Sequence, residues 1–396
     1  MPYPSPPAAF ACRPEESRGR DLAEPESPTR SCFQRDRDRI VHAGAFRRLK
    51  YKTQVFVYHE GDYYRTRLTH SIEVAQIARS ISRALGLNED LAEAVALAHD
   101  LGHTCFGHAG EDALKQVMAP YGGFGHNEQT FRILTLLERR YADFDGLNLT
   151  WETLEGIVKH NGPLTGPNAR EGETVPPTVA VYCRDRRDLE LATFASAEAQ
   201  VAALSDDIAY NNHDIDDGLR AGLFAIDDLR ELPLVGPVLA EVEARYPRLE
   251  EARLIHETVR RVIDRMVGDL LEETRRRVAA ARPDSATAVR GLAAPLVAFS
   301  DEMRQNDRAL RSFLFARMYR HYKVNRMTTK ARRVVRELFE HYLARPDCLP
   351  DEWQQQARDL PEAQRARLVA DYIAGMTDRY AQDEYARNFD IRVKNA

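Results

Sequence analysis

Close cysteine pairs, long apolar runs and an excess of positive charge are all missing from this sequence. Its five cysteines are scattered and form no CxxC pair, which argues against a zinc ribbon and a disulfide framework and favours a reducing cytoplasm. No stretch approaches the roughly 18 apolar residues of a membrane span, and the N-terminus lacks the apolar core of a signal peptide. The formal net charge of -5 gives no general attraction to nucleic acid or membranes, so a polyanion site has to be a local cluster.

The composition is that of a globular protein everywhere except at the N-terminal end. Hydrophobic residues make up 43% and charged residues 30% of the 396 residues, a balance that supports a large folded core. Residues 1–34 are instead rich in proline among Ser, Glu and Arg, a composition that buries little apolar surface. We predict a mobile proline-rich arm over residues 1–34.

Helical periodicity dominates the sequence after this arm. From Thr69, apolar residues recur at spacings of three and four until Gly86, a natural helix C-terminus, and Asn88 then caps a second helix. Further amphipathic segments follow as far as the C-terminal region. The one convincing strand signal lies at 54–64, where β-branched and aromatic residues flank a short turn. The pattern predicts an all-α, mainly helical fold with a single small β-hairpin.

Three of the expected helices carry residues suited to a divalent cation. Such a cation, when it binds phosphate, favours a mixture of imidazole and carboxylate ligands with open positions. His99 and Asp100 are adjacent, and both can reach one ion only where the helix ends, as the following Gly102 indicates. His70, at the start of another helix, and Asp206, on a third, are the remaining candidates. Three helical segments are thus expected to converge on one ion.

A lone His-Asp pair more often marks a solvated helix end than a metal site, but this pair has further polar company. His103, His108 and Glu111 follow it within a tight turn that contains glycines. Packing alone gives no reason for such a concentration of histidines. The functional interpretation is therefore favoured over the structural one.

Eight segments of the sequence, some of which contain the residues named above, together point to a known family. The sequence resembles the deoxyguanosine triphosphate triphosphohydrolase-like family, a branch of the HD-domain phosphohydrolases. The segments that carry the resemblance are 35–40, 46–49, 52–56, 65–71, 99–111, 159–163, 206–210 and 371–380. They run in order from the end of the arm almost to the C-terminus, so chance agreement is implausible.

The resemblance implies an organisation and a reaction. Residues 35–217 are expected to form the HD core, and residues 218–396 a helical region that completes the nucleotide pocket and makes oligomer contacts. The implied reaction is hydrolysis of a deoxynucleoside triphosphate between the 5′ oxygen and the α phosphorus, which releases the deoxynucleoside and inorganic triphosphate. The expected partners are this substrate and further copies of the chain in a homo-oligomer.

The resemblance assigns the metal ligands to His70, His99, Asp100 and Asp206. We choose Asp206 over its neighbour because two residues that the family places near the sugar follow it at steps of four on one helix face. The cofactor is a divalent metal ion, and two imidazoles with two carboxylates suit Mg, Mn, Fe or Co without a sharp preference.

The remaining site residues are also carried over from the resemblance. The candidates for proton transfer and for its support are His126, His103, Glu128 and Glu111. His126 and Glu128 resemble the family's catalytic histidine and its acidic partner, and Glu111 is expected to orient His103 or His108, unless it only stabilises a helix start. The candidates for substrate binding are Gln54, Val55, Arg67, His108, Tyr210, Asp214 and Tyr372.

Within this group, Arg67 and His108 are expected to hold phosphate oxygens and the others to enclose the deoxyribose. A tyrosine packed against C2′ leaves no room for a 2′ hydroxyl, and an aspartate can accept a hydrogen bond from the 3′ hydroxyl. The alternative for Tyr372 is a core residue with a satisfied hydroxyl, and for Arg67 a surface arginine.

Two other functions stay open at this point. One is an HD hydrolase that acts on nucleoside monophosphates, cyclic dinucleotides or guanosine polyphosphates. The other is a non-catalytic oligomer that binds nucleotide or single-stranded DNA. A basic run could serve the latter or bind an effector nucleotide, although it is more simply a solvated face; it comprises Arg317, Arg320, Lys323, Arg326, Lys330, Arg332, Arg333 and Arg336. Five histidines without ligand-like company default to structural or surface roles: His59, His213, His256, His321 and His341.

Overall fold

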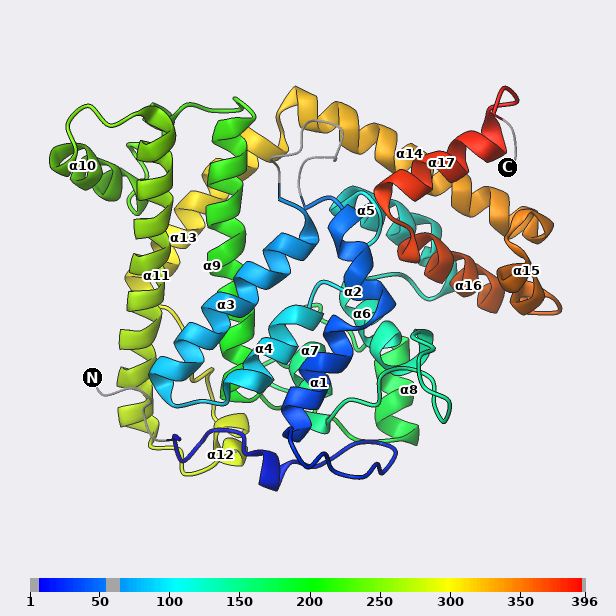
Figure 1. Ribbon diagram of the computed structural model, residues 1–396, viewed down its shortest axis with the longest axis horizontal. Coiled ribbons are helices and arrows are strands. Elements are labelled where there is room, and N and C mark those ends of the chain that lie inside the picture. The colour runs from blue at the N-terminus through cyan, green and yellow to red at the C-terminus, as the bar shows by residue number, and fades with distance from the viewer. Residues whose placement is uncertain (1–6, 55–64, 394–396) are drawn as a thin grey trace.

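The computed structural model describes residues 7–54 and 65–393, and over these residues the protein is built almost entirely of helices (Figure 1). The α-helices are α1 (Cys32–Val41), α2 (Gly44–Arg48), α3 (Arg67–Leu85), α4 (Glu89–Ala98), α5 (Gly107–Val117), α6 (His126–Arg132), α7 (Trp151–Val158), α8 (Pro177–Asp185), α9 (Ala197–Arg220), α10 (Val235–Arg245), α11 (Glu251–Ala281), α12 (Ala286–Arg290), α13 (Asp301–Leu314), α14 (Tyr322–Ala344), α15 (Asp351–Ala357), α16 (Glu362–Gly375) and α17 (Asp378–Phe389). The predicted all-α fold is confirmed.

The predicted β-hairpin at 54–64 lies almost wholly outside the described residues. At its base the structure has one isolated antiparallel bridge, between Thr53 and Thr66. Within the described parts of the chain, no helix combines the length and the apolarity needed to cross a bilayer.

Three helices, α3, α4 and α9, lie side by side at the centre of the molecule (Figure 1). Their starts are fixed by side-chain caps, as when the Asn88 side chain accepts a hydrogen bond from the Leu91 backbone N–H. The expected stop after α3 is present, because Gly86 adopts a left-handed φ of 70°. Small residues then allow close packing: a Cβ at Gly156 of α7 would lie 2.9 Å from side-chain atoms of both Val95 and Ala199. These contacts hold α4 and α9 in a fixed relation.

The apolar core is divided between two clusters of side chains. The larger one is formed by α1, α3, α4, α7 and α9 together with α10, α11 and α13. The smaller one joins α5 to the C-terminal helices α14, α16 and α17, which gather at one end of the molecule (Figure 1). The segment between α4 and α5 therefore runs from one cluster to the other.

The segment predicted to be a mobile arm packs against the core over its described residues. Phe10, Ala11 and Cys12 are buried, and the Cys12 backbone N–H donates a 2.8 Å hydrogen bond to the Glu198 carboxylate. Composition gave no hint of this, because the segment is held mainly by polar contacts with distant parts of the chain.

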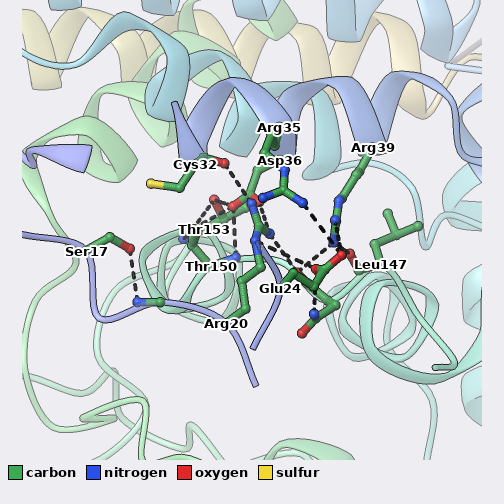
Figure 2. A network of polar contacts seen from close by, with 12 residues as sticks. Ser17, Arg20, Glu24, Cys32, Arg35, Asp36, Arg39, Leu147, Thr150 and Thr153 are labelled. Carbon is green, nitrogen blue, oxygen red and sulfur yellow. Dashed lines mark hydrogen bonds and ion pairs between the residues drawn. The ribbon is translucent and has the colours of Figure 1, made fainter. Parts of the chain in front are cut away.

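The main polar contact is a buried network around Asp36 of α1 (Figure 2). Asp36 is fully buried, and its carboxylate accepts hydrogen bonds from Arg20, from the Thr150 backbone N–H and from the Thr153 hydroxyl, at 2.5, 2.9 and 2.7 Å. Arg20 also donates to the Asn148 carbonyl at 2.6 Å. One carboxylate thus ties the N-terminal segment to α1 and to the start of α7.

We expect Asp36→Ala to lower the free energy of unfolding by about 3–5 kcal/mol, because it removes the closest ion-pair partner of the Arg20 guanidinium, whose side chain is only 6% exposed, and leaves the Thr150 and Thr153 donors without their acceptor. Asp38→Ala is the matched control. Asp38 lies on the same helix but is 29% exposed and pairs with Arg30 on the surface, so its loss should cost only about 0–1 kcal/mol. Chemical unfolding followed by circular dichroism measures both, and equal losses in the two variants would contradict a special role for the Asp36 network.

Candidate metal centre and active site

The structure brings the four predicted metal ligands together where α3, α4 and α9 meet. His70 lies in the first turn of α3, His99 and Asp100 directly follow α4, and Asp206 lies in the middle of α9. His70 Nε2 is 2.9 Å and His99 Nε2 is 3.5 Å from Asp206 Oδ1. His99 Nε2 is also 3.4 Å from Asp100 Oδ1. Four ligand atoms from three helices therefore surround one small volume.

The electrostatics of this volume favour a cation. His99 Nδ1 donates to the Ala96 carbonyl at 2.6 Å, whereas its buried Nε2 has no hydrogen-bond partner in the described parts of the chain. Burial alone would lower the pKa of His99, but the carboxylates of Asp100 and Asp206 raise it to about 9. The two carboxylates thus hold a positive charge on the imidazole, and a divalent cation bound by the same atoms would replace it. The donor set fits a divalent metal ion.

Asp206 and Asp207 point in different directions. The Asp207 carboxylate forms a 2.8 Å ion pair with Arg311 of α13, while Asp206 faces the histidines. His160, directly after α7, completes the surroundings: its Nε2 is 3.5 Å from Asp206 Oδ2, and its ring stacks on that of His99 at 5.5 Å. The sequence motif at 159–163 pointed to this residue without giving it a role.

A second polar cluster lies beside the first. Glu111 of α5 accepts hydrogen bonds from the backbone N–H and from Nδ1 of His126, at 2.9 and 2.7 Å, and its other oxygen is 3.1 Å from His108 Nδ1. His103 links the two clusters, since its Nε2 lies 3.2 Å from Asp100 Oδ1 while its ring stacks on that of His126. Burial alone would raise the pKa of Glu111, but hydrogen bonds from His108 and His126 hold it well below its ordinary value.

His103, Glu111 and His126 could also be considered as ligands of a second ion, but the ring geometry favours proton transfer. The rings of His103 and His126 are nearly parallel, at 15°, with centroids 4.0 Å apart. Nitrogen lone pairs lie in the ring planes, so in stacked rings they run side by side and do not converge on one point. His126 is held by Glu111 and its side chain is 26% exposed, an arrangement that suits the delivery or acceptance of a proton.

Glu128 does not belong to this cluster. Its carboxylate accepts a 3.0 Å hydrogen bond from the Thr178 backbone N–H and lies 3.9 Å from Arg367. The structure therefore gives His126 a different acidic partner, Glu111, which sequence analysis had assigned to His103 or His108.

The predicted phosphate-binding arginine is buried beside the candidate metal centre. Arg67 is 2% exposed and donates a 2.8 Å hydrogen bond to Asp100 Oδ2, while its Nε has no partner among the described residues. Gln54 is also buried, and within residues 7–54 and 65–393 its side-chain oxygen has no partner. Val55 lies outside the described residues. Unpaired buried donors and acceptors at such a site are available to a polar ligand.

Two of the five predicted sugar-binding residues, Tyr210 and Asp214, lie together, with a further tyrosine that sequence analysis missed. Tyr319, in a π-helical turn after α13, donates a hydrogen bond from its hydroxyl to the Asp214 carboxylate, and the same hydroxyl oxygen is in hydrogen-bond contact with the Tyr210 hydroxyl. Burial, together with the Asp217 charge, raises the pKa of Asp214 to about 8. Tyr372 lies elsewhere: its hydroxyl is 3.2 Å from that of Tyr380, and its ring packs against Trp353.

After His160, His213 is the second histidine to which sequence analysis gave no role at the site. It was expected to lack ligand-like company, yet its Nδ1 lies 3.1 Å from Nδ1 of His70. Burial lowers the pKa of His213 to about 4. No local pattern indicated the contact, because the two histidines belong to helices far apart in sequence.

The basic run, which lies on the segment after α13 and on α14, is partly neutralised. Arg317, Arg332 and Arg333 form ion pairs with acidic side chains at 2.6, 2.8 and 2.7 Å. Arg320 and Arg326 instead lie over the rings of the exposed Phe315 and Tyr322. These contacts do not test whether the basic run binds nucleic acid, so that interpretation stays a prediction.

The HD-domain class of hydrolases is defined by adjacent His and Asp at a helix end, together with a histidine and an aspartate from two packed helices. This chain has that set, with an imidazole cluster beside it. Residues 67–211 match the HD domain, and residues 297–387 match the phosphohydrolase-associated domain. The fold, the site and the domain matches agree.

Comparison with whole proteins narrows the class to a family. The chain is 62% identical to the deoxyguanosinetriphosphate triphosphohydrolase-like protein of Parvibaculum lavamentivorans, with all of both chains covered. It is 60% identical to the protein of the same name from Azorhizobium caulinodans, with 96% of each chain covered. The Brucella anthropi protein is 58% identical, with 97% of this chain and 95% of that protein covered. The chain belongs to the deoxyguanosinetriphosphate triphosphohydrolase-like family.

We expect Asp206→Ala to lose a bound divalent metal and Asp207→Ala to retain it, because only the first side chain faces the other ligands. Both variants should keep the helical content of the parent, measured by circular dichroism. Metal content after gel filtration, measured by inductively coupled plasma mass spectrometry, separates them. Retention by Asp206→Ala with loss by Asp207→Ala would reverse the assignment.

Proposed function

We propose that this chain hydrolyses a deoxynucleoside triphosphate to the deoxynucleoside and inorganic triphosphate. The observation that carries the proposal is the position of the tyrosine and aspartate cluster on the same helix as a metal ligand. Tyr210 and Asp214 follow Asp206 by one and two turns of α9, about 6 and 12 Å along the axis. Two atoms, C5′ and the 5′ oxygen, separate the sugar ring from the α phosphorus. A sugar bound by these residues would therefore have its α phosphorus close to the metal ligands.

The alternative site of attack is less compatible with this arrangement. The γ phosphorus is two further P–O–P links from the sugar, so its hydrolysis would require a cluster of cations farther from Tyr210 than the HD residues are. The division of the chain into an HD core at 35–217 and a C-terminal region that completes the pocket is part of this proposal. So is assembly into a homo-oligomer.

His70, His99, Asp100 and Asp206 would hold the divalent ion, with Mg, Mn, Fe and Co as candidates. When bound, the ion supplies Lewis acidity and positive charge for an α-phosphate oxygen. Arg67, fixed by Asp100, donates from its guanidinium to phosphate oxygens. In the overall reaction a water oxygen bonds to the α phosphorus and the bond from phosphorus to the 5′ oxygen breaks.

His126 transfers the proton that this reaction requires. As the 5′ oxygen leaves, it gains negative charge and must be protonated to become the hydroxyl of the deoxynucleoside. His126, oriented through Nδ1 by the Glu111 carboxylate, presents Nε2 for this task. Glu111 also stabilises the protonated imidazole, so His126 can hold the proton until the bond breaks.

The sugar pocket is expected to select deoxyribose. Tyr319, Tyr210 and Asp214 are joined by hydrogen bonds, so they form a rigid wall in which the aspartate can accept from the 3′ hydroxyl. A 2′ hydroxyl placed against the tyrosine rings either clashes or loses its hydrogen bonds, at a cost of about 1–3 kcal/mol.

We therefore expect each active deoxynucleotide to give the deoxynucleoside and inorganic triphosphate, and ribonucleotides to react at least about tenfold more slowly. Ion-exchange chromatography of the products, over the four bases with each metal, makes the measurement. Orthophosphate and a diphosphate as products would contradict attack at the α phosphorus. Equal rates on ribonucleotides would contradict the sugar pocket but not the cleaved bond.

We expect His126→Ala to retain metal and substrate binding while kcat falls by about 10²- to 10⁴-fold, the usual contribution of a proton-transfer group. His256→Ala, which removes an exposed histidine of α11, is the control and should leave kcat unchanged. Steady-state kinetics with equilibrium binding of a non-hydrolysable deoxynucleotide tests this. A normal kcat in His126→Ala would remove this residue from the mechanism.

A further inference from the structure

We propose that His213 and Glu73 form a hydrogen-bonded relay that fixes the tautomer and orientation of His70. The two are positioning residues that act through a metal ligand, so the inference rests on the metal centre of the proposed function. It adds a support that neither the domain matches nor the names of the relatives specify.

The two ring nitrogens of His70 face different partners. Nε2 points to the candidate metal site, 2.9 Å from Asp206 Oδ1, and Nδ1 points away from it, 3.1 Å from Nδ1 of His213. The two rings are nearly perpendicular, at 82°. His70 is 1% and His213 4% exposed, so bulk water does not compete for this contact. The orientation of His70 is therefore set by protein groups on both sides.

Glu73 supports the other nitrogen of His213. Its carboxylate makes a short hydrogen-bond contact with His213 Nε2, and the same oxygen lies 3.2 Å from Arg65 Nε. Arg65 is held in turn by a 2.8 Å ion pair with Asp216. The carboxylate thus has a fixed position, one turn after His70 on α3.

Once a cation is bound by His70 Nε2 and the Asp206 carboxylate, only one assignment of protons satisfies the contacts of this chain. To bind a metal, His70 Nε2 must offer a lone pair, so the ring proton is on Nδ1 and is donated to His213 Nδ1. His213 then carries its own proton on Nε2 and donates it to Glu73. The reverse assignment puts a proton on His70 Nε2 and aims a His213 lone pair at a carboxylate, which is repulsive. Glu73 therefore selects the tautomer of His70 that binds metal.

The helix spacing explains how the relay is built. Glu73 follows His70 by three residues on α3, and His213 follows Asp206 by seven on α9, so each pair lies on one helix face. Because α3 packs against α9, the same helix contact aligns the two ligands and the relay behind them. Supporting partners of this kind typically change metal affinity 10- to 100-fold when they are lost.

The test measures the affinity of the metal-free full-length protein for Co²⁺ by competition with a chelator. We expect His213→Leu and Glu73→Ala each to weaken Co²⁺ binding about 10- to 100-fold. The double variant should be no weaker than His213→Leu alone, because both residues act through one chain. His341→Asn is the control, since its ring on α14 packs against Tyr342 and Phe389.

Two further readouts separate a relay from a merely structural contact. His213→Asn should recover part of the affinity lost in His213→Leu, because its side-chain oxygen lies close to the position of Nδ1 and can accept from His70. In the Co²⁺-loaded protein, proton NMR should show a strongly shifted, exchangeable signal from His70 Nδ1–H. This signal should exchange with solvent faster in Glu73→Ala and His213→Leu than in the parent.

The outcomes are distinct from those that test the proposed function. Affinities within about twofold of the parent in both single variants, with His70→Ala strongly weakened, overturn the relay and leave the metal centre intact. A parent protein that binds Co²⁺ no better than His70→Ala overturns the metal centre and the relay with it. If His213→Leu does not fold, Glu73→Ala decides the matter alone, because the Glu73 side chain is 43% exposed and its loss opens no cavity in the core.

Discussion

The close approach of two carboxylates, buried Asp100 and the 23% exposed Asp206, between three helices is the constraint on which the rest of this structure depends. Asp100 is 5% exposed, and it shares its small volume with Asp206. Carboxylates this close repel each other unless positive groups stand against them, and the structure provides Arg67 at 2.8 Å and the imidazole of His99. Such compensation works only if the helices cannot separate. Tight packing at the centre, with glycines where backbones approach, is therefore needed for the proposed chemistry as well as for the fold.

Gly102 shows how closely fold and site are connected. A Cβ there would lie 2.1 Å from the His126 carbonyl and 2.2 Å from the Thr130 backbone nitrogen, so only glycine lets the start of α6 pack against the chain after Asp100. The same residue, which sequence analysis used as a helix stop, therefore also brings His126 beside the HD residues. A larger side chain would clash with the His126 backbone and so displace the proposed proton-transfer cluster from the proposed metal ligands.

Local signals predicted the helices and the four candidate ligands, because caps, glycine stops and apolar periodicity are properties of short segments. The partners that sequence analysis missed depend on contacts between distant segments. Tyr319 reaches Asp214 across 105 residues, and His213 reaches His70 across 143. The packing of the N-terminal segment was missed for the same reason. Its proline-rich composition gives no sign that Arg20 pairs with the Asp36 carboxylate on α1. Resemblance placed Glu111 near the right histidines, but only the structure shows that His126 is its principal partner.

The site also lies at the junction of the two apolar clusters. Lys52 donates from Nζ to the carbonyls of His103 and Ala374, at 2.6 and 2.8 Å, and so joins the proton-transfer cluster to the end of α16. Asp378, which starts α17, accepts a 2.7 Å hydrogen bond from the Phe106 backbone N–H. The turn that carries His103 is therefore held by the C-terminal helices, whereas the metal ligands are held by α3, α4 and α9. A shift of the C-terminal helices would move the proposed proton-transfer group relative to the proposed metal ligands, so the geometry of the candidate site depends on contacts that neither cluster supplies by itself.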